Sequence, residues 1–224
     1  MLALLLAAQR PAATVAGAPD LRSSEDAAAG LRAALDQGID TAVARLGVSD
    51  GFLKNPRTTI PLPPALQKVE RGLRMLGRGG DADALKLAIN RAAAAAVSEA
   101  RPLLKQALSG MTVADANAIL SGGDDAGTQY FRRTTTTSLT GKFKPIVASA
   151  IAKLKVSALY EQYAGEAAAL GLVRNEDARL DDYLTDKALA GLFTVMADEE
   201  RAIRNDPLGQ TNTLIRKAFG ARQQ

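Results

Sequence analysis

The sequence predicts an all-α protein, a compact orthogonal bundle of about eight to ten helices with one extended, proline-rich strap. Apolar residues recur at the three- and four-residue spacing of helices along most of the chain. No segment shows the strict alternation of apolar and polar residues that is typical of a half-buried strand. Alanine, a strong helix former, supplies 44 of the 224 residues. These patterns favour helices packed on helices.

The apolar stripes set the order of the predicted elements. They place helices near residues 23–47, 64–76, 81–97, 103–108, 112–120, 124–133, 139–154, 159–163, 185–204 and 214–220. Two of the starts resemble capping boxes, Ser23 with Asp26 and Thr112 with Asp115. Pro145 lies inside one of the later stripes and predicts a helix start or a kink there.

Residues 48–64 interrupt the helices and contain four prolines. Pro61 and Pro63 restrict the residues before them to extended backbone, so we expect an ordered strap rather than a helix. The apolar residues of the strap are Phe52, Leu53, Ile60 and Leu62. Stiffening an exposed apolar pair would gain nothing, so these side chains are expected to be buried against the bundle.

The chain contains no histidine, cysteine or tryptophan, and these absences exclude several classes of function. A disulfide, a thiolate nucleophile, a Cys/His zinc site and a catalytic histidine are all ruled out. The net charge of +4 comes from scattered basic residues, and aromatic residues make up only 4% of the chain. Without a dense basic face or an aromatic stacking platform, nucleic acid is not an expected partner. No cofactor is expected either.

The first eight residues, MLALLLAA, are apolar, and small residues follow up to an Ala16-Gly17-Ala18 site. This pattern resembles the hydrophobic and cleavage regions of a secretory signal peptide. We therefore expect residues 1–18 to be a signal peptide or an apolar N-terminal tail, and residues 19–224 to form a single all-α domain. The apolar run is too short to span a bilayer, which needs about 20 residues. The sequence thus predicts an exported, periplasmic protein without a transmembrane span.

The densest polar sequence is Gly122-Gly123-Asp124-Asp125, directly before a predicted helix. Two adjacent carboxylates after glycines could touch a metal or another ligand. The simpler interpretation is a helix N-cap, with Asp124 as the capping residue. Asp124 and Asp125 are therefore candidate ligand-binding residues with a competing structural role, and the identity of any metal is unknown.

Glu200 is the most informative candidate, because helical spacing places it among apolar residues. On a wheel of 100° per residue it lies about 20° from Leu189, in the middle of the apolar stripe of the last long helix. A buried carboxylate needs a partner or a proton. It either forms a structural ion pair that locks two helices, or it binds a ligand or metal or acts in acid/base chemistry.

The basic residues that could pair with Glu200 come from two segments. Arg132 and Arg133 follow Tyr130 in one predicted helix, and Arg204 lies one turn after Glu200. Asp186 and Arg204 lie on the same edge of the apolar face. Together with the two aspartates above, the candidate ligand-binding residues are Tyr130, Arg132, Arg133, Asp186, Glu200 and Arg204.

Several short motifs are similar to those of one bacterial family. They include Asp50-Gly51-Phe52, Ile60-Pro61-Leu62-Pro63, Asn90-Arg91-Ala92-Ala93, Gly123-Asp124-Asp125-Ala126 and Thr185-Asp186-Lys187-Ala188-Leu189. Through them the chain resembles the family catalogued as domain of unknown function 4197, over about residues 27–220. The resemblance implies an exported protein of bacteria with a Gram-negative-type envelope. It implies no established activity.

Three classes of function remain open. The favoured class is a non-enzymatic binding or scaffold protein of the cell envelope, with a small apolar ligand or an envelope protein as its partner. The alternative is a carboxylate-dependent, hydrolase-type enzyme that uses a metal or acid/base chemistry. A nucleic-acid binder has the least support. A ferritin-type di-iron site is excluded, because it needs histidine.

Overall fold

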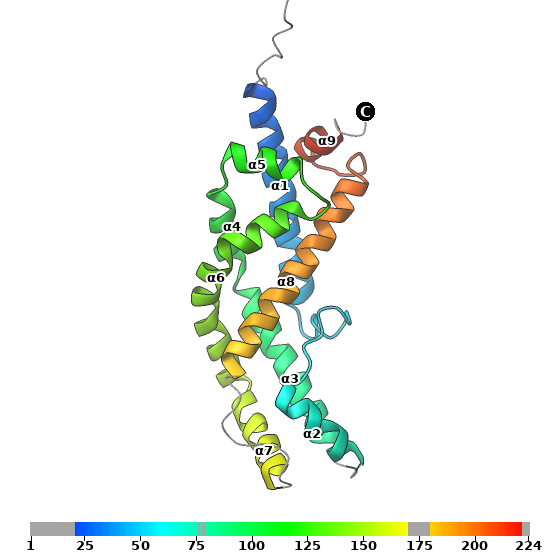
Figure 1. The fold of residues 1–224 in the computed structure, drawn as a ribbon, viewed down its shortest axis with the longest axis vertical. Helices are drawn as coiled ribbons and strands as arrows, with labels where there is room; N and C mark the ends of the chain where they lie inside the picture. Colours follow the sequence, from blue (N-terminus) through cyan, green and yellow to red (C-terminus); the bar gives the residue numbers. More distant parts are fainter. Residues whose placement is uncertain (1–20, 76, 78, 170–179, 221–224) are drawn as a thin grey trace, which may run out of the picture.

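The computed structural model describes residues 21–75, 77, 79–169 and 180–220, and these form helices without a strand (Figure 1). The predicted all-α fold is therefore confirmed. In chain order, the helices of this part of the chain are α1 (Leu21–Leu46), α2 (Pro64–Met75), α3 (Gly79–Ser98), α4 (Arg101–Ser109), α5 (Val113–Leu120), α6 (Ala126–Lys153), α7 (Val156–Ala169), α8 (Leu180–Asn205) and α9 (Thr213–Gly220).

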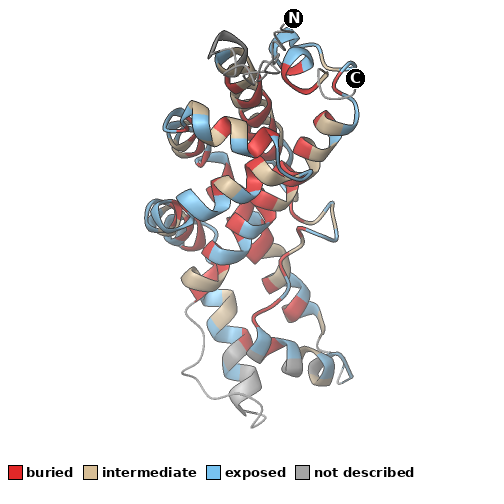
Figure 2. Cartoon of the chain, turned by 45° about the horizontal axis from the view of Figure 1, so that its top comes forward, coloured by how far each residue is buried: buried red, intermediate tan, exposed pale blue. Residues whose placement is uncertain are grey.

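The helix α8 is the central element of the bundle. It packs against α1, α3, α6 and α9, and Figure 1 shows it crossing the middle of the molecule. At one end α5 and α9 pack against α1, and at the other end α2 and α7 pack against α3. In Figure 2 the buried residues gather where these helices face one another. The apolar stripes of the sequence thus meet in one continuous core.

The strap between α1 and α2 is anchored at both of its halves. Phe52, Ile60 and Leu62 are buried, as predicted, whereas Leu53 is only half-buried. The side chain of Asn90 on α3 accepts a hydrogen bond from the Ile60 N–H and donates one to the Ile60 carbonyl, both 2.8 Å long. The extended backbone of the strap has no hydrogen bonds within a helix. The two bonds to Asn90 therefore satisfy the N–H and the carbonyl of Ile60 inside the core.

Several helix boundaries differ from the predicted ones. The helix α1 is already formed at Leu21, so Ser23 lies inside it and is not its cap. Residues 126–153 form one helix, although threonines and Pro145 predicted an interruption. The hydroxyls of Thr134 and Thr135 bond to carbonyls four residues back, so the threonines are accommodated within the helix. The capping box of Thr112 and Asp115 is confirmed at the start of α5.

Two predictions lie outside the described residues. The signal peptide or tail at residues 1–18 is one of them, and most of the predicted turn at residues 171–181 is the other.

Candidate functional site

Glu200 is buried on α8 and points at the first turn of α6. Its Oε1 atom accepts a hydrogen bond from the Gly127 N–H (2.9 Å), and Oε2 accepts two from Thr128, one from the N–H (2.8 Å) and one from the hydroxyl (2.9 Å). The first N–H groups of a helix have no partner within that helix. Glu200 therefore caps α6 from a different helix.

Arg204, one turn after Glu200, completes the same cluster. Its Nε and Nη2 atoms donate to Glu200 Oε1 at 3.1 and 2.8 Å, and Nη2 also donates to the Ile119 carbonyl at the end of α5. Its guanidinium lies 5.2 Å from the centre of the Phe219 ring on α9. One buried carboxylate and one arginine thus connect the ends of four helices.

The prediction that Glu200 is buried and paired is confirmed, and Arg204 is the partner among those considered. Arg132 is exposed, and its guanidinium lies over the Phe193 ring at 5.3 Å. Arg133 is exposed on α6. The Glu200 carboxylate accepts five hydrogen bonds where two oxygens offer about four lone-pair sites, so the geometry gives it a structural role.

The two adjacent aspartates do not cap α6 as predicted. Asp125 occupies the N-cap position, but its side chain makes no capping hydrogen bond and pairs instead with Arg201 on α8. Asp124 is exposed in the preceding turn. Because Glu200 already satisfies the first N–H groups of α6, the Asp125 side chain is free to form the ion pair.

Three of the predicted residues meet at a surface hollow. Asp125, Tyr130 and Arg133 line a depression of about 450 Å³ between α5 and α6, together with Asp115. Burial and a hydrogen bond with Asp115 raise the pKa of Tyr130. Hydrogen bonds from the Thr112 side chain and backbone, and from Tyr130, lower the pKa of Asp115. The Asp115 carboxylate is therefore committed to holding the start of α5.

Asp186 lies apart from the other candidates. It is exposed on α8, fourteen residues before Glu200, and the helical rise separates the two by roughly 21 Å. The predicted residues are therefore divided between a buried structural cluster, a shallow hollow and isolated surface positions, and they do not form one site.

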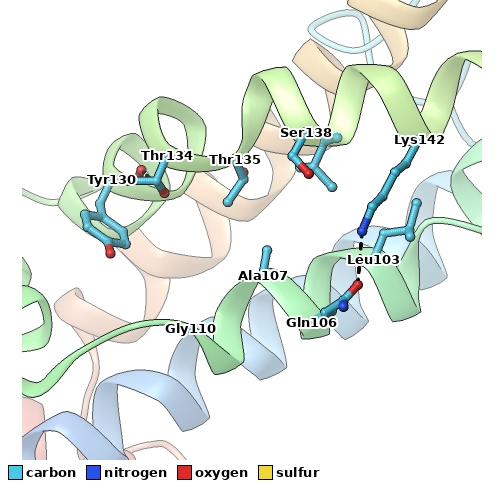
Figure 3. Close-up of a pocket in the computed structure, with 10 residues that line it drawn as sticks. Leu103, Gln106, Ala107, Gly110, Tyr130, Thr134, Thr135, Ser138 and Lys142 are labelled. Carbon is cyan, nitrogen blue, oxygen red and sulfur yellow. Dashed lines mark hydrogen bonds between the residues drawn. The ribbon is translucent and has the colours of Figure 1, made fainter.

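The structure reveals a different candidate site, a groove between α4 and α6 (Figure 3). Its first part, which we call the hydroxyl hollow, has a volume of about 390 Å³. Its α6 wall carries Tyr130, Thr134, Thr135 and Ser138, and its α4 wall ends in Ala107 and Gly110. Lys142 on α6 donates a 3.2 Å hydrogen bond to the Gln106 side chain on α4 and closes this part of the groove.

The second part of the groove, which we call the apolar hollow, has a volume of about 670 Å³. It continues past Leu103 and Lys142, which line both hollows, towards the end of α6. Its other lining residues are mainly apolar or small and include Ala95, Pro102, Pro145, Ile146, Ala150 and Leu154. Ser98, Glu99, Ser149 and Lys153 complete it, all of them exposed.

Several lining positions of the groove carry side chains that are short or are held close to their own helix, which leaves space between the walls. The hydroxyls of Thr134 and Thr135 bond back to carbonyls of α6, which keeps these side chains close to their own helix. Opposite them, Ala107 and Gly110 offer almost no side chain. Along the apolar hollow the two prolines and the alanines have the same effect.

The electrostatics of the groove are those of α6. This helix contains five Lys or Arg residues and no Asp or Glu. Lys144 forms ion pairs with Asp181 and Asp182, which raise its pKa. Within the described part of the chain, Lys142 and Lys153 have no carboxylate partner. The hydroxyl hollow therefore offers the positive charge of Lys142 with no carboxylate in its lining, whereas the apolar hollow is lined by Lys142, Lys153 and one carboxylate, that of Glu99.

Of the residues that line the groove, Tyr130 was a candidate from the sequence, whereas Gln106, Ser138 and Lys142 were missed. The absence of acidic residues over positions 126–153 was the available sign that α6 presents a basic surface. Thr128 and Gly127 were missed as partners of Glu200, because only the tertiary structure brings the start of α6 to α8.

Among the described helices none is long and apolar enough to cross a membrane. Nor does the described part of the chain gather three or more acidic side chains that could hold a metal ion. The fold and the groove define an all-α helical bundle protein. The chain matches the family described as "Protein of unknown function (DUF4197)" over residues 22–220, and it belongs to that family. The comparisons with curated proteins and with solved structures gave no match.

Proposed function

We propose that this protein is a non-enzymatic binding protein of the bacterial cell envelope, and that its ligand lies in the groove between α4 and α6. The observation that carries the proposal is the groove itself, whose two hollows meet at Lys142. Volumes of about 390 and 670 Å³ fall in the range of roughly 300–1,000 Å³ that is usual for ligand pockets.

The chemistry of the groove supports binding rather than catalysis. Its polar groups are hydroxyls, one amide, lysine ammonium groups and a single carboxylate, that of the exposed Glu99. The Thr134 and Thr135 hydroxyls already donate to backbone carbonyls. A carboxylate-dependent enzyme would use Asp124, Asp125, Asp186, Glu199 or Glu200, and of these Glu200 is the buried one. That carboxylate is saturated by hydrogen bonds, so it has no free oxygen with which to take a proton or a metal.

Native mass spectrometry of the protein isolated from an envelope fraction tests the proposal. Ser149→Trp and Ser138→Trp should fill the apolar and hydroxyl hollows from exposed positions. Ala190→Trp places the same side chain at an exposed position of α8 as a control. We expect an added mass on the wild type and on the control, and its loss from both groove variants.

Two outcomes would contradict the groove as the binding site. One is a wild-type protein that carries no added mass after gentle isolation. The other is an added mass that persists in both groove variants while thermal melting shows that they are folded.

The envelope location rests on the apolar segment MLALLLAA and the Ala16-Gly17-Ala18 site. N-terminal sequencing of the protein from a fractionated cell tests it. We expect a periplasmic species that starts after about residue 18. An intact Met1 in the cytosolic fraction would contradict export.

A further inference from the structure

We propose that the ligand of the α4–α6 groove is a single-chain amphiphile with an anionic head group. The inference rests on the proposed binding function and specifies the chemistry of its ligand. The head group lies beside Lys142 in the hydroxyl hollow, and the alkyl chain lies along the apolar hollow.

The two hollows differ in the chemistry that they offer. The hydroxyl hollow presents the Ser138 hydroxyl, the Gln106 amide and the Lys142 ammonium. These groups suit an oxygen-rich head group, because each can donate a hydrogen bond to it. The apolar hollow is lined mainly by apolar or small side chains, among them Ile146, Ala150 and Leu154, and its further polar residues, Ser98, Glu99, Ser149 and Lys153, are exposed.

Lys142 marks the boundary between the two environments. Its ammonium is held by the neutral side chain of Gln106, and no described carboxylate pairs with it. An ammonium has three donors, and a single amide oxygen uses one of them. An anionic oxygen beside Gln106 would add a charge-assisted hydrogen bond, which is stronger than a neutral one.

The length and exposure of the apolar hollow favour an alkyl chain. From Lys142 to Lys153 the axis of α6 rises by roughly 17 Å, which suits an extended chain lying parallel to the helix. Leu154 is 42% exposed at the far end, among the large apolar side chains that the bundle leaves in solvent. Covering this surface would remove apolar area from water, which favours binding.

Equilibrium dialysis with labelled laurate and labelled 1-dodecanol tests the inference. The two probes share an alkyl chain and differ in the charge of the head. We expect laurate to bind the wild type about tenfold or more tightly than 1-dodecanol, as a charge-assisted hydrogen bond implies. Lys142→Ala should weaken the binding of laurate by about tenfold or more, and it should change the affinity for 1-dodecanol by no more than about twofold.

Lys54→Ala is the matched control, because it removes the same charge from an exposed position outside the groove. It should leave the binding of both probes unchanged, whereas Ser149→Trp should abolish the binding of both. If both probes bind equally and Lys142→Ala changes neither, the anionic head group is wrong while the groove remains the binding site. If neither probe binds the wild type, or if Ser149→Trp leaves laurate binding intact, the inference is overturned. In that case, native mass spectrometry of the isolated protein still tests separately whether the groove binds a ligand of another kind.

Discussion

Glu200 joins the start of α6 to α8 through a carboxylate that is almost wholly removed from water. Glu200→Gln preserves the shape of the side chain and removes its charge, leaving the Arg204 guanidinium buried without a counter-ion. Breaking a buried pair in this way typically costs about 3–5 kcal/mol. We expect a loss of that size in the free energy of unfolding, measured by urea denaturation.

Glu199→Gln is the control for this prediction. The neighbouring Glu199 pairs with Arg45, whose side chain is 61% exposed. Such surface pairs contribute about 0–1 kcal/mol, so the control should lose little. Equal losses in the two variants would contradict the structural role of Glu200.

Gly127 is placed where a side chain would collide with the same cluster. A Cβ atom there would lie 2.9 Å from Leu35 Cδ2 and 3.1 Å from Glu200 Oε1. Gly127→Ala should therefore destabilise the protein by about 1–3 kcal/mol, as overpacking does, despite the better helix propensity of alanine. Thermal or urea unfolding measures the effect.

The same helix supplies a matched control, Gly141. A Cβ atom there would meet nothing within 4 Å, so Gly141→Ala should stabilise the protein by about 0.5–1 kcal/mol. If alanine stabilised the protein at both positions, the close packing around Gly127 at the start of α6 would be contradicted.

At the residue scale, the inward direction of Glu200 could be predicted from helical spacing, and so could a partner one turn away. The hydrogen bonds from Gly127 and Thr128 could not, because they depend on which helix end meets α8. The sequence pattern for an N-cap pointed to Asp124 and Asp125. Neither side chain caps the helix, because the cap comes from Glu200, which lies 73 residues after Gly127.

At the scale of elements, the capping box of α5 has a consequence for pH dependence. Hydrogen bonds hold the pKa of Asp115 below its usual value of 3.8. A carboxyl group with a lowered folded-state pKa stabilises the fold above its unfolded pKa, and this stabilisation is lost as the pH falls through the folded-state pKa. The difference in melting temperature between wild type and Asp115→Asn should thus be largest near pH 7 and should shrink as the pH falls below the usual aspartate pKa of 3.8.

Asp124→Asn is the control for that pH series, because the Asp124 carboxylate is exposed and makes no hydrogen bond or ion pair within the described residues. Its melting temperature should follow that of the wild type at every pH. A difference between wild type and Asp115→Asn that grows as the pH falls from 7 into the acid range would contradict the assignment.

The strap behaves as an element of the core rather than as a loop. Leu62 is 1% exposed, so Leu62→Ala should cost about 2–5 kcal/mol in the free energy of unfolding. Leu208 is 70% exposed, and Leu208→Ala should change the stability by less than about 0.5 kcal/mol. A loss below about 0.5 kcal/mol for Leu62→Ala would show that the strap is not packed in solution.

The prolines allowed the strap to be predicted, because proline restricts backbone geometry locally. The continuity of α6 could not be predicted in the same way. Its threonines and Pro145 weaken a helix by local rules, but the buried contacts of Leu139, Phe143 and Val147 hold the helix in one piece. The groove was also beyond local rules, because it arises from the distance between two helices.

At the scale of the whole molecule, α8 contacts helices from both halves of the chain. Unfolding of any one of them would expose part of the shared core, so we expect a single cooperative transition. Calorimetric and van't Hoff enthalpies should agree, and Glu200→Gln should shift the transition without splitting it. Two separate transitions would contradict a common core.

The cap that Glu200 provides also sets an order in time. The hydrogen bonds from Gly127 and Thr128 span 73 and 72 residues of sequence. At a synthesis rate of about 5–20 residues per second, the carboxylate leaves the ribosome roughly 4 to 15 s after the amides that it satisfies. During that interval the first turn of α6 lacks the cap that it has in the folded protein. A nascent chain therefore cannot form this cap until Glu200 has emerged, with only the last tenth or so of the 224 residues still to follow.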